Sequence, residues 1–261
     1  MRPTLSLPFI LLIAFAILSW KILEKNWISE KHKGYNLLFT SADEKNKKEY
    51  NLLVEQGIAS INSFFSSSYK KDFDIYVHPD RHSLDSTWKK DWNMPDFKSE
   101  CWMVASGVAS KLDMISPKIW DAESCEHKYA DAIHTQQLIT HELVHVYHGQ
   151  INASPDFSNT EGIDWFVEGL ATYASGQLDS SRLAEIKKTI IENKTPLALD
   201  DFWKGNLKYG LSGSVVMYID KKYGKEKLKQ LLPFSKKSEI ISALNTTEPE
   251  LLKGWKDYLQ K

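Results

Sequence analysis

Alternation of apolar and polar residues predicts β-strands in the first half of the chain. Residues 73–79 alternate in this way, as strands with one buried face do, and residues 36–40 are a short strand candidate. Residues 101–117 also have a mostly two-residue period. We expect one or two strands there, with a bend at Gly107, because glycine inside a strand often marks a bend.

Apolar residues at helical spacing dominate the rest of the chain. A helix is expected over residues 41–65, where Ser41 and Glu44 have the spacing of a capping box, and another around residues 83–91. The helices expected later span residues 130–148, 164–176, 181–193, 213–223, 225–232, 236–244 and 248–260. Strands before residue 117 and helices after residue 130 predict the α+β class.

The N-terminal segment differs from everything that follows it. Residues 3–20 carry no charge, and about 17 helical residues extend ~26 Å, close to the thickness of a thin bilayer. The only small-residue triplet of the signal-cleavage type lies inside this apolar run. We therefore predict that residues 1–22 are an uncleaved transmembrane anchor and residues 23–34 a stalk. A removed signal segment is the alternative, and the protein would then be secreted. Both alternatives place the body of the protein outside the cytoplasm.

Composition and charge are those of a globular protein. The 261 residues, 42% of them apolar, suffice for one large domain or two lobes. We expect an N-terminal α+β lobe over residues 35–150 and a helical C-terminal lobe over residues 151–261. The 33 basic and 34 acidic residues leave a net charge of -1, which gives no electrostatic reason for binding nucleic acid.

The chain contains two cysteines, Cys101 and Cys125. Outside the cytoplasm two cysteines without other partners are expected to pair, and the alternative is two unpaired thiols. The loop that such a disulfide closes would stabilise the fold by about 3.5 kcal/mol in the chain-entropy model.

The segment "HELVH" has the spacing of a metal-binding helix. His141 and His145 are four residues apart, so they share one helix face and can present two imidazole nitrogens to one ion. Glu142 projects about 100° around the helix axis, beside the metal but away from a ligand position. Two neutral nitrogen ligands and a carboxylate that accepts a proton from water are what a zinc hydrolase needs. An ordinary core helix remains the alternative.

A third ligand is required for a catalytic zinc site. Glu168, 23 residues after His145, begins a second helical segment and is followed by Gly169. A helix packed across the first could bring this carboxylate to the metal, and Gly169 would let the two helices approach closely. Alternatively, Glu168 is a surface residue near a helix N-terminus, where negative charge is favoured.

These residues resemble the gluzincin metallopeptidases, specifically the peptidase MA-like group. The similar segments are "HELVH", "WFVEGLATYASG" against the group's W-[LF]-x-E-G-x-A-x-Y pattern, "LALDDF", and "YGLSGSVVMYIDKKYGKEKL". The resemblance covers roughly residues 70–260. It implies a zincin-like fold, zinc bound by His141, His145 and Glu168, Glu142 as general base and acid, and hydrolysis of peptide bonds.

Two positions depart from the pattern of that group. Ile163 stands where the group often has proline, and Thr172 stands where several gluzincins have an acid that supports a zinc histidine. A metal-bound imidazole without a hydrogen-bonding partner loses affinity, so another residue must orient the ring. Asp164 is our candidate for that role.

The remaining functional predictions concern the substrate. A tetrahedral oxyanion needs a donor besides the metal, and related gluzincins use a tyrosine downstream of the glutamate. Tyr209 is the candidate, with a buried core tyrosine as the alternative. Residues 107–116 could be an edge strand that pairs with an extended peptide, or an ordinary sheet strand. His148 is expected to contact the terminal carbonyls of its own helix rather than the metal.

We therefore expect a membrane-anchored, outward-facing zinc endopeptidase that acts on peptide or protein substrates. Its fold would combine a small mixed β-sheet, the HExxH helix and a mainly helical C-terminal lobe. One alternative is a binding or scaffold protein that keeps the fold without turnover, and another is a metal-free exported domain. The intact Glu142 favours activity, because loss of the base is the simplest way to abandon catalysis.

Overall fold

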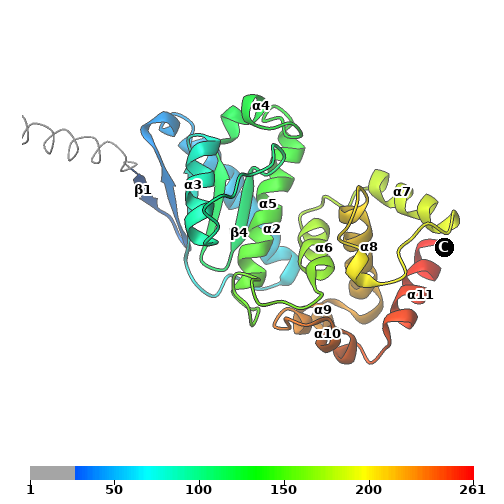
Figure 1. Cartoon of the computed structure of the whole chain (residues 1–261). Helices are drawn as coiled ribbons and strands as arrows, with labels where there is room; N and C mark the ends of the chain where they lie inside the picture. Colours follow the sequence, from blue (N-terminus) through cyan, green and yellow to red (C-terminus); the bar gives the residue numbers. More distant parts are fainter. Residues whose placement is uncertain (1–26) are drawn as a thin grey trace, which may run out of the picture.

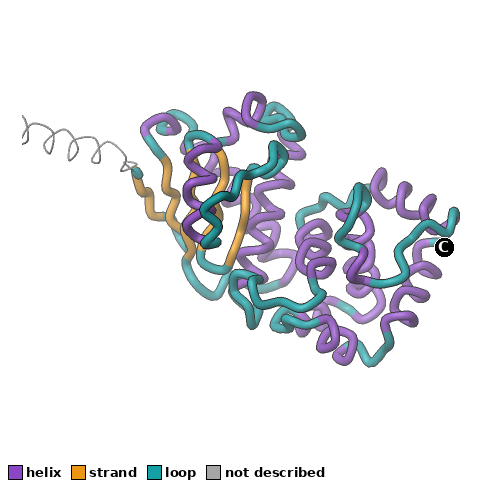
Figure 2. Tube along the Cα trace, viewed as in Figure 1, coloured by secondary structure: helices purple, strands orange, loops and turns teal. Residues whose placement is uncertain are grey.

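A five-stranded mixed β-sheet forms one side of the protein in the computed structural model, which describes residues 27–261 (Figures 1 and 2). The strands are β1 (Ile28–Lys31), β2 (Tyr35–Phe39), β3 (Phe73–His78), β4 (Ala105–Val108) and β5 (Lys111–Ile115). Their spatial order is β1-β2-β3-β5-β4, with β2, β3 and β5 parallel and the two edge strands antiparallel. Together with the helices, this sheet confirms the α+β class.

Helices lie beside the sheet and also form the other side of the protein (Figure 1). They are α2 (Lys47–Phe65), α3 (Arg81–Asp91), α4 (Trp120–Glu123), α5 (Ala132–Gly149), α6 (Asp164–Ala174), α7 (Ser180–Ile191), α8 (Lys208–Tyr223), α9 (Lys225–Leu231), α10 (Lys237–Ala243) and α11 (Glu248–Leu259). Figure 1 shows α6 to α11 gathered away from the sheet. Helix α8 begins five residues before its predicted start, because Gly210 and Gly213 pack against neighbouring segments instead of ending a helix.

The predicted anchor, residues 1–22, lies outside the described residues. No helix within residues 27–261 has both the length and the hydropathy to cross a bilayer. Part of the predicted stalk is instead strand β1, which pairs with β2 after a turn at Gly34, where φ is +91°. The polar sequence of this edge strand, "ISEK", carries no apolar alternation, so the pattern could not reveal it.

A buried polar cluster replaces the predicted capping box at Ser41 and Glu44. Residues 41–43 form a short 3-10 turn, and α2 begins only at Lys47. The fully buried carboxylate of Asp43 accepts hydrogen bonds from Tyr50 and from the Ser116 hydroxyl, at 3.2 and 2.6 Å. The Lys118 ammonium pairs with the same carboxylate at 2.9 Å and balances its buried charge.

Helices α2 and α5 cover the face of the sheet on which Leu37, Ile75, Leu112 and Gly107 stand side by side. A Cβ atom at Gly107 would lie 2.2 Å from the backbone oxygen of Glu142. Gly107 is therefore the point where α5 approaches β4, and the predicted bend there is wrong. The chain reverses between β4 and β5 instead.

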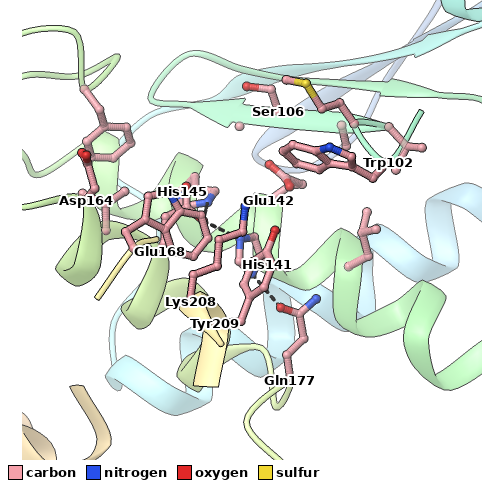
Figure 3. Close-up of a pocket in the computed structure, with 18 of the residues that line it drawn as sticks. Trp102, Ser106, His141, Glu142, His145, Asp164, Glu168, Gln177, Lys208 and Tyr209 are labelled. Carbon is pink, nitrogen blue, oxygen red and sulfur yellow. Dashed lines mark hydrogen bonds and ion pairs between the residues drawn. The ribbon is translucent and has the colours of Figure 1, made fainter. Parts of the chain in front are cut away.

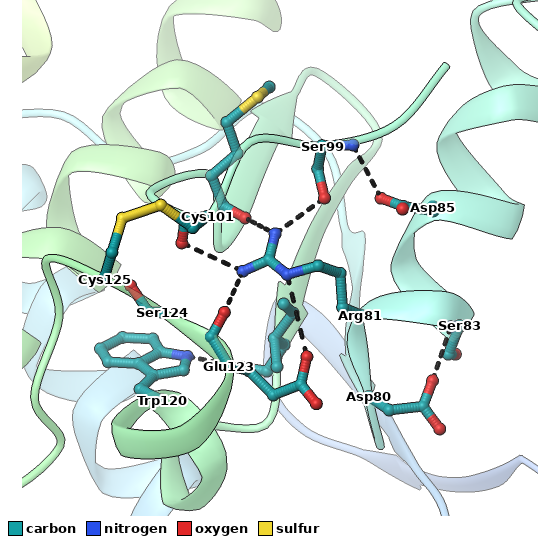
Figure 4. A network of polar contacts seen from close by, with 12 residues as sticks. Asp80, Arg81, Ser83, Asp85, Ser99, Cys101, Trp120, Glu123, Ser124 and Cys125 are labelled. Carbon is teal, nitrogen blue, oxygen red and sulfur yellow. Dashed lines mark hydrogen bonds and ion pairs between the residues drawn. A yellow bond between two sulfur atoms is a disulfide. The ribbon is translucent and has the colours of Figure 1, made fainter. Parts of the chain in front are cut away.

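One disulfide and one arginine hold the loop before β4. Cys101 and Cys125 are bonded, with Cα atoms 5.4 Å apart, which confirms the predicted pairing. Figure 4 shows the Arg81 guanidinium donating to the backbone oxygens of Cys101 and Glu123, and it also donates to that of Met103 at 2.8 Å. Five N–H donors in a rigid plane suit such multiple contacts. This loop is thus tied both to α3 and to the segment after α4.

Replacing both cysteines with serine should lower the free energy of unfolding by up to about 3.5 kcal/mol. The disulfide joins residues 24 apart in sequence, and without it the unfolded chain gains conformational entropy. Urea unfolding of the oxidised protein and of Cys101→Ser/Cys125→Ser measures the difference. The reduced wild-type protein should unfold like the double variant. Equal midpoints for all three samples would contradict this account.

His148 connects α5 to the C-terminal helices. Its Nε2 atom donates to the backbone oxygen of Leu232 at 3.1 Å, and Asn152 donates to the same oxygen at 2.9 Å. The expected contact with the carbonyls of its own helix is therefore wrong, because a carbonyl of the facing segment lies within reach. Complete burial, with the nearby His145 adding to it, lowers the pKa of His148 to about 3.

This depressed pKa predicts an acid-dependent loss of stability. Below pH 6.5 His148 becomes protonated in the unfolded chain but stays neutral in the folded protein. The free energy of unfolding therefore falls as the pH decreases from about 6.5 to about 3. Relative to His148→Gln, the wild-type protein should lose about 3 kcal/mol between pH 7 and pH 4. Denaturant unfolding of both proteins at pH 7 and pH 4, in the presence of a chelator, tests this. A difference in unfolding free energy between the two proteins that does not change with pH would refute it.

Candidate metal centre

Helix α5 carries the two histidines of the HExxH segment on one buried face. His141 and His145 are each only 6% exposed, and their ring centroids lie 4.8 Å apart. The helix begins after Asp131, whose carboxylate accepts from the backbone N–H of His134 and so caps the first turn. Two adjacent imidazoles are thus presented from a single rigid element.

Glu168 reaches the same place from the first turns of α6. Its Oε2 atom lies 3.3 Å from Nε2 of His141 and 3.6 Å from Nε2 of His145. One ligand atom from each of the three residues lies within 4.8 Å of the other two. Figure 3 shows the three side chains converging from two helices, so the fold brings together the group that the sequence singled out.

Helix α6 is positioned by α8. A Cβ atom at Gly169 would lie 2.4 Å from the backbone oxygen of Ser212 and 3.0 Å from Val216. Glycine thus permits the close approach of α6 and α8, and the expected role of Gly169 between the two metal-binding helices is wrong. Glu168 precedes this contact by one residue, so the tight packing fixes where its side chain begins.

The three groups strongly perturb one another. Burial alone would raise the pKa of Glu168, but the charges and hydrogen bonds of His145 and His141 hold it well below its ordinary value. For His145, burial lowers the pKa, but the carboxylates of Glu168 and Glu142 outweigh it and the pKa is raised. Glu168 is therefore ionised at neutral pH, as a metal ligand must be.

Gln177 orients the first imidazole. Its Oε1 atom accepts a hydrogen bond from Nδ1 of His141 at 2.8 Å (Figure 3). The chain turns after α6 at Gly176, where φ is +80°, and the Gly176 carbonyl accepts from Gln137 of α5. Because Gln177 takes the Nδ1 side of the ring, Nε2 is the ring nitrogen that faces Glu168, and it is the nitrogen that a metal ion would bind.

This partner is not the one that the sequence indicated. Asp164 makes no hydrogen bond to either imidazole among the described residues, and burial, followed by the charge of Glu168, raises its pKa. Thr172 is fully buried and packs against Gly213 of α8. Gln177 was missed because it follows a turn, and no helical spacing relates it to His141.

The donor set fits a divalent metal ion. Ligand atoms around a tetrahedral zinc lie about 3.3 Å apart, given bonds of about 2.0–2.1 Å. The 3.3 and 3.6 Å separations from Glu168 are close to that value.

A cleft of about 510 Å³ opens above the three residues. Glu142 lines it beside His141, and the ring of Tyr209, on the first turn of α8, lies 6.2 Å from the ring of His141. Burial, assisted by the nearby carboxylates, raises the pKa of Tyr209, so its hydroxyl stays protonated and can donate. Both candidate residues therefore line the same cleft as the metal-binding group.

Strand β4 forms the opposite wall of the cleft and is the outer strand of the sheet. Of the predicted edge segment, residues 107–116, only the start belongs to this outer strand. Strand β5 lies inside the sheet because it pairs with β3 as well as with β4. The edge facing the cleft is therefore Ala105–Val108.

Comparison with models of known protein families found no match for this chain, and no curated protein matched it. The similarity to the gluzincins therefore rests on short motifs. The three-residue site is an independent observation about the same residues.

Loss of the hydrogen bond from Gln177 should weaken metal binding. We expect Gln177→Leu to raise the Kd for zinc about 10–100-fold, because the His141 ring loses the partner that fixes its tautomer and orientation. Competition with a chromophoric chelator measures the affinity. Gln56→Leu, at an exposed position of α2, is the matched control and should bind like the wild type. Equal affinities for all three proteins would contradict the role of Gln177.

Proposed function

We propose that the protein is a zinc-dependent endopeptidase of the gluzincin type. The observation that carries this proposal is the meeting of His141, His145 and Glu168 at the floor of an open cleft that Glu142 also lines. Two imidazoles and one carboxylate are the ligand set of many catalytic zinc sites. When bound, zinc supplies Lewis acidity, which polarises a carbonyl and lowers the pKa of water.

The proposed chemistry assigns a separate task to each remaining residue. The Glu142 carboxylate accepts a proton from the attacking water and returns it to the leaving nitrogen. The protonated hydroxyl of Tyr209 donates a hydrogen bond to the oxygen on which negative charge develops. Gln177 keeps the His141 ring in one orientation throughout.

Strand β4 is the proposed binding site for the peptide backbone. Its outer edge faces the cleft, and Ala105–Val108 could pair with an extended peptide as an added strand. Such pairing holds the scissile bond above the metal-binding group without requiring a particular side chain. Peptide and protein substrates both satisfy this geometry.

The proposal includes the location of the enzyme. The apolar segment of residues 1–22 would anchor it in a membrane, with the cleft facing outward, or would be removed to release it. The paired cysteines support a compartment outside the cytoplasm, where disulfides persist.

Glu142→Gln should keep the metal and lose activity. We expect the cleavage rate of a mixed peptide library to fall about 10²–10⁴-fold, because the amide cannot accept a proton, while zinc remains bound at one ion per chain. Mass spectrometry of the products and metal analysis give the two readouts. Glu226→Gln, at an exposed position of α9, is the control. Zinc binding without cleavage by the wild-type protein would instead favour a scaffold that retains the fold.

A further inference from the structure

Two cations lie together at one end of the cleft, on the His141 side of the metal-binding group. Lys208 begins α8, Arg182 belongs to α7, and both line the cleft beside Tyr209. The Lys208 ammonium lies 5.3 Å from the centre of the Tyr209 ring, and the Arg182 guanidinium lies 5.5 Å from it. Both side chains are half-buried rather than extended into solvent.

Indole rings from both walls of the cleft surround the ammonium group. Lys208 Nζ lies 4.8 Å from the ring centre of Trp102 and 4.7 Å from that of Trp203. Trp102 belongs to the loop that the disulfide and Arg81 hold, whereas Trp203 precedes α8. Contacts with aromatic faces stabilise a partly desolvated cation, but they provide no counter-charge and no strong hydrogen-bond acceptor.

The two cations retain unused hydrogen-bonding capacity. Within residues 27–261, neither the Lys208 ammonium nor the Arg182 guanidinium donates a hydrogen bond to protein or forms an ion pair with a carboxylate. An ammonium has three donors and a guanidinium has five. Glu126 is the acid that lines the same end, and its side chain is exposed. Half-buried cations arranged in this way are suited to an anionic ligand.

The other end of the cleft has the opposite charge. On the His145 side the lining includes Phe157, whose ring lies 6.1 Å from that of His145, together with Asp156 and Asp164. The acids nearest the centre, Glu142 and Glu168, belong to the metal-binding and proton-transfer machinery. A substrate along the cleft therefore meets cations beyond His141 and carboxylates beyond His145.

We infer that Lys208 and Arg182 form a subsite for a carboxylate of the substrate, an inference that rests on the proposed peptidase function. The carboxylate can be an acidic side chain near the scissile bond or the free C-terminus of a short peptide. Lys208 and Arg182 donate to its oxygens, and Trp102 and Trp203 flank it. The subsite therefore selects acidic substrates and sets their direction in the cleft.

Binding of matched peptides tests this subsite separately from catalysis. The probes are short N-acetylated peptides in pairs that differ only by Glu or Gln at one position, each with a free or an amidated C-terminus. Binding is followed by tryptophan fluorescence in the zinc-loaded Glu142→Gln variant, and cleavage of the same peptides is followed in the wild-type protein. The pair that shows the preference identifies which kind of carboxylate the subsite recognises.

We expect the preferred acidic peptide to bind at least about tenfold more tightly than its neutral partner, with a preference that weakens as salt increases. Lys208→Met and Arg182→Met should each reduce this preference, and Lys208→Arg should retain it. Lys204→Met is the control and should behave like the parent protein. Lys204 is an exposed lysine in the segment before α8, and it pairs with Asp201.

The subsite and the peptidase proposal can fail independently. Selective binding of acidic peptides without cleavage by the wild type supports the subsite and overturns the peptidase function. Cleavage without any preference between acidic and neutral partners supports the peptidase function and overturns the subsite. Absence of binding by every acidic peptide, or an equal loss of preference in Lys204→Met and Lys208→Met, also overturns the subsite.

Discussion

The attraction between the Glu168 carboxylate and the two imidazoles of α5 is the interaction on which the candidate site depends. Placing a carboxylate in a partly buried site is unfavourable, and the two imidazoles offset that cost for Glu168. The position of Glu168 is set by the packing of α6 against α8, which meet closely at Gly169. Contacts between helix surfaces thus place this carboxylate beside the two imidazoles.

The orientation of His141 follows from a residue outside both metal-binding helices. Gln177 occupies the Nδ1 side of the ring, so Nε2 is the nitrogen that faces Glu168 and would bind a metal ion. An amide oxygen carries no full charge, and it therefore fixes the ring without adding a second anion to a crowded site. Gln177 thus supplies the orienting hydrogen bond that Thr172, packed against α8, does not give.

The helices and inner strands could be predicted because their apolar spacing reports local burial, and His141, His145 and Glu168 could be selected because metal chemistry restricts ligand types. Strand β1 could not be found, since its edge position buries too little to produce a pattern. The segments that contact Gly107, Gly169 and His141 could not be predicted either. Each depends on which distant segment packs alongside, and neither spacing nor composition encodes such pairings directly.

The two walls of the cleft are built differently, and this bears on what a bound metal would do. The sheet wall is stiffened by the Cys101–Cys125 disulfide and by the contacts of Arg81, whereas the helical wall is defined by the packing of α6 on α8. Histidines from α5 and the glutamate from α6 would join these walls through one ion. Metal affinity therefore includes part of the free energy that holds the two sides together.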